Sequence, residues 1–243
     1  MIKLSHFTGR DIPVPELKMT LHQPSIAELS YLGTDEDIFS TIKFIATDKT
    51  KYFQNTSLPQ QITNFQIFSI ILQEENSRKL KNNTFSLLFI LFPNYKFMFS
   101  PSGGLIANNA ETNHSVIIDD SNFNVLQEKV SDVFQVSKLF MSEDNYNPVN
   151  QKAREIAEKI KRGKQRVAAQ KGNSQESLLG RYISILSVGL NINPQEICKW
   201  TLPVLYEVFE RYNLYLKWDI DLKVRLAGGS PDNSADDWMK DII

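Results

Sequence analysis

The chain has 243 residues, with 27 lysines and arginines against 28 aspartates and glutamates, so its formal net charge is −1 at pH 7. This balance argues against a dedicated nucleic-acid-binding protein. The single cysteine, Cys198, excludes an internal disulfide framework and fits a reducing compartment. No apolar signal-peptide core follows Met1, and Pro93 divides the most apolar run, Phe85 to Phe99. We therefore expect a soluble intracellular protein without a membrane span.

The first part of the chain predicts a short strand followed by helices. Residues Leu17 to His22 alternate between apolar and polar side chains, as a short strand does. Ser25 and Glu28 have the spacing of a capping box and predict the start of a helix. Thr34 or Asp35 is expected to cap a second helix.

The middle of the chain predicts strands between two helices. A helix is expected from Ile62 to about Lys79. The run Phe85–Phe92 is apolar nearly throughout, which is typical of a strand covered on both faces. We expect Tyr95–Phe99 to return beside it as a hairpin partner, and Val116–Ile118 to form another strand. The spacing of apolar residues then predicts a helix from Phe123 to Phe134.

The last third of the chain is expected to be helical. Ser142–Asn150 is polar and contains a proline, so we interpret it as a linker. The predicted fold class is α+β, with N-terminal helices and a small antiparallel sheet followed by a C-terminal all-helical domain. The expected domains are residues 1–141 (α+β), 142–150 (linker) and 151–243 (helical).

The longest predicted helix begins near Thr201 and ends at Gly228. Acidic residues precede basic ones by four positions, as in Asp219 and Lys223, and these pairs are expected to be surface ion pairs. Asp219 and Asp221 point to different faces, so they do not form a catalytic carboxylate pair. The expected buried stripe consists of Val204, Leu205, Val208, Tyr212, Tyr215, Trp218 and Leu222.

No pattern of catalytic or metal-binding residues stands out in the sequence. The histidines, His6, His22 and His114, have no Cys or His at ligand spacing, so no metal site is predicted. No serine lies in a Gly-x-Ser-x-Gly elbow, and the turn Pro101–Gly104 lacks the ending of a phosphate-binding loop. We therefore predict a protein that is not an enzyme and has no catalytic residues, metal or cofactor.

One strongly basic segment, Gln151–Lys171, leaves several interpretations open. It can be a solvated helix, a surface that contacts nucleic-acid phosphates, or a docking face for an acidic partner helix. Aromatic residues do not interleave with its charges, so stacking of single-stranded bases is not supported.

Three stretches of the chain resemble a protein family. They are the C-terminal block, the stretch His22–Leu29 and the stretch Asn147–Ile160. The C-terminal block consists of Leu205–Glu207, Glu210–Tyr212, Trp218–Gly228 and Asp237–Ile242, and its most distinctive part is Trp218-Asp219, Arg225–Gly228 and Trp238-Met239. The C-terminal block is the most specific of the three. Together they resemble tail-region proteins of long-tailed bacteriophages and prophages of Gram-positive bacteria, a family similar to the tail assembly chaperones.

The resemblance implies a non-enzymatic protein in the cytoplasm of the infected bacterial host. Such chaperones coat the hydrophobic, helical tape measure protein and keep it soluble until tail tube subunits polymerise around it. Long amphipathic helices with aromatic residues can offer grooves to a partner helix, and a basic face can steer an acidic one. The expected partner-binding residues are Lys159, Arg162, Arg166, Tyr206, Arg211, Trp218, Arg225 and Trp238.

Two other functions remain alternatives. One is a structural subunit of the tail or baseplate that stays in the virion. The other is a nucleic-acid-binding protein that uses the basic helix 151–171. The sequence leaves open whether the chain forms a homo-oligomer.

Overall fold

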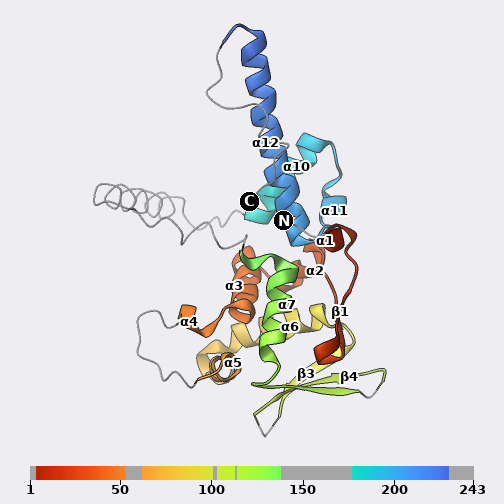
Figure 1. Ribbon diagram of the computed structural model, residues 1–243, viewed down its shortest axis with the longest axis vertical. Helices are drawn as coiled ribbons and strands as arrows, with labels where there is room; N and C mark the ends of the chain where they lie inside the picture. Colours follow the sequence, from red (N-terminus) through yellow and green to blue (C-terminus); the bar gives the residue numbers. More distant parts are fainter. Residues whose placement is uncertain (1–3, 53–61, 101–102, 113, 138–176, 230–243) are drawn as a thin grey trace, which may run out of the picture.

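The computed structural model describes residues 4–52, 62–100, 103–112, 114–137 and 177–229, and the fold is α+β as predicted (Figure 1). The N-terminal helices are α1 (Leu4–Thr8), α2 (Ile26–Leu29), α3 (Asp35–Ala46), α4 (Lys49–Tyr52), α5 (Asn64–Gln73), α6 (Arg78–Leu91) and α7 (Phe123–Phe134). Strands β1 (Ile12–Val14) and β2 (Met19–Leu21) pair antiparallel, and a second antiparallel sheet has the order β3 (Tyr95–Phe99), β4 (Leu105–Asn109), β5 (Ser115–Ile118). The C-terminal helices are α10 (Leu178–Leu190), α11 (Pro194–Ile197) and α12 (Leu202–Leu226).

The apolar run Phe85–Phe92 is helical, so the predicted strand is wrong. It forms the C-terminal half of α6, in which Leu87, Leu88 and Leu91 are fully buried while Phe89 is 53% exposed. Spacings of one, three and four residues between buried positions mark one face of a helix. A run that is apolar almost throughout does not distinguish a buried strand from a buried helix by periodicity, and here the helix begins earlier, at Arg78.

Strand β3 consequently has a different partner from the one predicted. Its residues pair with β4, in a register that sets Tyr95 opposite Asn109. Helix α6 instead lies over this sheet, where Phe85 packs edge-on against Phe99 with 5.9 Å between ring centroids. The predicted contact between these two segments therefore exists, but it joins a helix to a sheet.

The core of the N-terminal part is centred on Phe68 of α5. Its ring stacks on Phe44 of α3 at 5.3 Å and lies 4.7 Å from Phe123 of α7, and Phe65 adds a further ring at 6.4 Å. Rings that approach at these distances contribute burial and favourable aromatic contacts. This cluster fixes α3, α5 and α7 to one another.

The motif His22–Leu29 connects the N-terminal part to the C-terminal helices. Ser25 and Glu28 form the predicted capping box, which satisfies one backbone N–H of each residue. The next two N–H groups at the start of α2 donate to carbonyls at the end of α11: Ile26 N to Trp200 O and Ala27 N to Cys198 O, each at 2.9 Å. Free N–H groups of a helix start need such acceptors, so this motif joins α2 to the segment between α11 and α12.

A second connection runs from α3 to α10. Of the two residues predicted to cap α3, Thr34 is the cap, whereas Asp35 binds the start of α10. The Asp35 carboxylate accepts hydrogen bonds from the Ser177 hydroxyl and from Leu179 N, both at 3.0 Å. The predicted linker 142–150 lies outside the described residues, while the described parts on either side of it share one hydrophobic core.

Candidate interaction surface on the C-terminal helix

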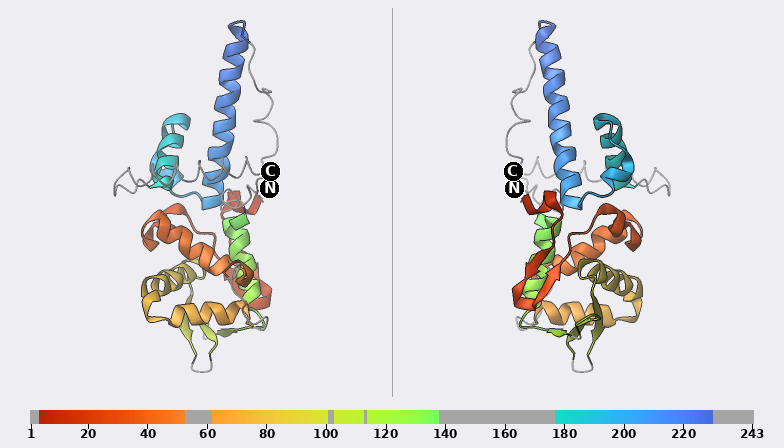
Figure 2. Two further views of the ribbon diagram at one scale, coloured as in Figure 1. Left: turned by 90° about the vertical axis from the view of Figure 1, so that its left-hand side faces the viewer. Right: turned by 90° about the vertical axis from the view of Figure 1, so that its right-hand side faces the viewer.

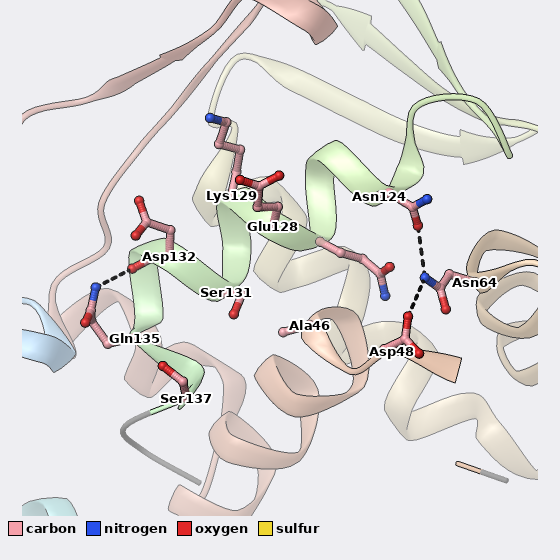
Figure 3. A pocket seen from close by; sticks show the side chains of 11 residues that line it. Ala46, Asp48, Asn64, Asn124, Glu128, Lys129, Ser131, Asp132, Gln135 and Ser137 are labelled. Carbon is pink, nitrogen blue, oxygen red and sulfur yellow. Dashed lines mark hydrogen bonds between the residues drawn. The ribbon is translucent and has the colours of Figure 1, made fainter. Parts of the chain in front are cut away.

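A polar hollow of about 720 Å³ lies between the end of α3, the start of α5 and one side of α7 (Figure 3). Asn64 bridges two of its walls, because its side-chain NH₂ donates to Asp48 at 3.1 Å and to Asn124 at 2.9 Å. Hydrogen bonds from Thr50 lower the pKa of the Asp48 carboxyl. These polar groups hold a turn and two helices together, so we interpret the hollow as structural.

Two kinds of site are missing from the part of the chain that the structure describes. No three His, Cys, Asp or Glu side chains come together there in a way that could hold a metal ion. No helix in the same residues is long and apolar enough to cross a membrane.

The first half of α12 is anchored to α10. Tyr182 of α10 stacks on Phe209 at 3.9 Å between ring centroids and packs edge-on against Tyr206 at 5.5 Å. Further along, the backbone of Gly189 lies directly against the ring of Tyr212. Helix α10 then ends at Leu190, so α12 continues without it (Figure 2).

The second half of α12 stands beyond the rest of the described structure (Figure 2). Leu216 is 36% exposed, Ile220 58% and Val224 38%. Tyr215, Leu222 and Leu226 are exposed as well. Of the predicted buried stripe, Val204 and Leu205 are buried, Tyr215 and Leu222 face solvent, and the others, Val208, Tyr212 and Trp218, are half-buried. Exposed apolar residues gathered on one element mark an interaction surface.

The apolar side chains on the second half of α12 form two stripes. The inner stripe consists of Leu216, Ile220 and Val224, and it continues the line of Phe209 and Tyr212 that packs on α10. The outer stripe consists of Leu214 and Trp218, which are half-buried, and Leu222, which is exposed. Each of its members precedes a member of the inner stripe by two residues, which is about 200° around an α-helix. The two stripes therefore lie on opposite sides of α12.

The inner stripe was not predicted, although the sequence contains a signal for it. From Leu214 to Leu226, every second residue is apolar and the residues between them are mostly charged. Strict alternation is typical of a half-buried strand. On a helix it places apolar side chains on two opposite sides, so no single neighbouring element can cover them all.

The predicted partner-binding residues fall into three groups. Arg211, Trp218 and Arg225 are seven residues apart and share the side of the outer stripe, where Arg211 also pairs with Glu207 at 3.2 Å. Tyr206 lies apart from them, against α10. The remaining residues, Lys159, Arg162, Arg166 and Trp238, lie outside the described residues, as does the basic segment Gln151–Lys171.

Tyr206 should make the fold less stable at alkaline pH. Burial raises the pKa of its hydroxyl, and Tyr182 and Asp35 nearby raise it further. Above pH ~10 the unfolded chain loses this proton while the folded chain keeps it, so stability falls as pH rises, by at most ~1.4 kcal/mol per pH unit. Urea titrations from pH ~9 to ~11 should therefore show a smaller loss for Tyr206→Phe than for the unsubstituted protein. Equal losses would contradict this burial of the hydroxyl.

Comparisons of the chain with protein-family profiles, with curated proteins and with solved structures gave no match. The functional argument therefore rests on the geometry of α12 and on the residues of the C-terminal block.

Proposed function

We propose that the protein is a non-enzymatic phage tail assembly chaperone that binds the tape measure protein and tail tube subunits. The observation that carries this proposal is the second half of α12, which exposes apolar side chains on opposite sides beyond the rest of the described structure. The longest described stretch of the most specific resembling block, Trp218–Gly228, coincides with this half of the helix. Within this stretch Ile220 and Leu222–Leu226 are exposed and open to a partner, whereas Trp218 is half-buried.

The outer stripe has the chemistry to bind a helix of a client protein. Leu214, Trp218 and Leu222 follow one another at intervals of four residues, which matches apolar residues three and four apart on an amphipathic helix. Arg211 and Arg225 lie on the same side, seven residues before and after Trp218. Tryptophan and arginine are the side chains that most often dominate binding energy at protein interfaces. Burial of these side chains by a client would remove apolar surface from water.

Co-expression with the tape measure protein of the neighbouring gene tests the proposal. We expect the client to stay soluble and to co-purify with the chain. Leu222→Asp on the outer stripe, together with Leu226→Asp four residues further along, should lower the recovered client by at least ~10-fold, because the client would lose its apolar contacts there. Both positions are exposed, so the fold should tolerate the change.

Ile70→Asp is the matched control, since Ile70 is also an exposed apolar residue on a helix, at 56% exposure, and its helix, α5, lies far from α12 (Figure 1). This variant should keep the client soluble. Equal recovery with the α12 variant and the control, or no gain in solubility from the unsubstituted chain, would argue against the proposal. Mass spectrometry of purified virions provides an independent check, because a chaperone should be absent and a structural subunit stoichiometric.

A further inference from the structure

The inner stripe extends an existing helix–helix interface past the point where one helix stops. Phe209 and Tyr212 of α12 pack on α10, and α10 ends at Leu190, where Asn191 adopts a left-handed φ of 53°. Leu216, four residues after Tyr212, begins the part of the stripe beyond that end. The surface that α10 covers on the first half of α12 therefore continues, with the same apolar character, along the second half.

We propose that a second copy of this chain covers the inner stripe, with the two α12 helices antiparallel about a two-fold axis at Ile220. In this arrangement Ile220 meets its own counterpart, and Leu216 of each copy meets Val224 of the other. A two-fold contact of this kind uses the same patch on both chains, as most homodimers do. It does not depend on the client-binding function proposed above.

The length of the exposed segment fits this arrangement. Tyr212, beside the end of α10, precedes Ile220 by eight residues, which is about 12 Å of helix, and Ala227 follows Ile220 by seven residues, which is about 10 Å. The tip of the second α12 therefore fills the interval between the axis and the end of α10. It continues the line of α10 without overlapping it.

The charges beside the inner stripe are complementary in this orientation. Lys217 and Asp221 lie on one flank, and Asp219 and Lys223 lie on the other, already paired with each other at 2.6 Å. In an antiparallel two-fold contact, each flank of one α12 meets the same flank of the other α12. The two flanks run in opposite directions. Lys217 then approaches Asp221 of the second copy, and Asp219 approaches its Lys223. Opposite charges across an interface favour the correct partner and register.

Steric hindrance excludes the parallel alternative. A parallel second α12 would place its first half alongside the first half of this one, on the face where Tyr182 and Gly189 of α10 pack. That space is filled. The antiparallel contact avoids α10 in both copies.

The contact is small, so the dimer should depend on concentration. Each copy contributes the short inner stripe and its flanking charges, which places the interface at the low end of specific protein contacts, below ~1,200 Å² in total. Sedimentation equilibrium of the full chain should show a mass that rises from 27.9 kDa towards twice that value between ~1 and ~200 µM protein.

Two aspartate substitutions on opposite sides of α12 test which stripe forms the contact between the two copies. Ile220→Asp puts two carboxylates together at the axis and should move the midpoint of association to at least ~30-fold higher concentration. Leu222→Asp makes the same chemical change on the outer stripe and should leave the midpoint within ~3-fold. A monomer at every concentration, or equal effects of the two substitutions, would overturn the proposal. A monomer at every concentration would instead point to cover by the chain's own residues 230–243 or by a client, and equal effects would point to association through another surface.

Cross-linking tests the position of the axis. In a Cys198→Ser background, Ile220→Cys should oxidise to a covalent dimer, because residues on a two-fold axis lie within reach of a disulfide. Leu222→Cys in the same background should remain monomeric. The reverse result would overturn the proposal. Failure here is distinguishable from failure of the chaperone function, since Ile220→Asp should still keep a client soluble and Leu222→Asp should still dimerise.

Discussion

Phe68→Ala should destabilise the fold by about 3–5 kcal/mol, the cost of removing a large ring from a packed core. Phe68 is 3% exposed and contacts rings from α3 and α7, so the cavity left behind opens at the point where these helices meet α5. The surrounding rings Phe44 and Phe123 cannot close it without moving their helices. Urea denaturation followed by circular dichroism measures the loss as a lower midpoint at unchanged slope.

Phe89→Ala is the matched control for this substitution. It removes the same ring from a helix, but Phe89 is 53% exposed, and we expect a change of no more than about 1 kcal/mol. The comparison also tests the assignment of Phe85–Phe92 to α6. A strand covered on both faces would bury Phe89, and the two substitutions would then cost similar amounts.

Gly189→Ala should destabilise the contact between α10 and α12 by about 1–3 kcal/mol through overpacking. A Cβ at this position would overlap the Tyr212 hydroxyl oxygen and the ring carbon that bears it. The ring must therefore move, and its movement disturbs the anchor of α12. Thermal or urea denaturation of the purified variant measures the loss.

A double-mutant cycle identifies the cause of that loss. With Tyr212→Ala already present, nothing occupies the position of the new Cβ, and Gly189→Ala should become neutral or stabilising by up to about 1 kcal/mol, since alanine favours a helix over glycine. If the substitution costs the same in both backgrounds, the ring of Tyr212 is not the obstacle.

Local signals in the sequence predicted the parts of the fold that depend on neighbouring residues. The capping box of Ser25 and Glu28 was predicted from residues three positions apart, and the structure confirms it. The run Phe85–Phe92 was assigned wrongly because its class depends on what lies around it. Three of its leucines face the core as one side of a helix, and this is decided by α6 beginning at Arg78 rather than by the run itself.

The candidate interaction surface on α12 could be predicted only in part, because its exposure also depends on what lies around it. The long helix followed from the spacing of its apolar residues, whereas the common side of Arg211, Trp218 and Arg225 was not predicted. Which half of α12 is covered depends on where α10 ends, at Leu190, and that is a property of the packed structure. The alternation from Leu214 to Leu226 was visible, but its meaning changes with the secondary structure that it adopts.

The bonds between α2 and the end of α11 have a consequence for the order of events during synthesis. The N–H groups of Ile26 and Ala27 leave the ribosome early, whereas the carbonyls of Cys198 and Trp200 that accept them are translated near the end. Until then the start of α2 depends on its capping box and on water. Contacts between residues so far apart in the sequence slow folding. In a nascent chain that stalls before Trp200, proteases should therefore be able to cleave at the start of α2.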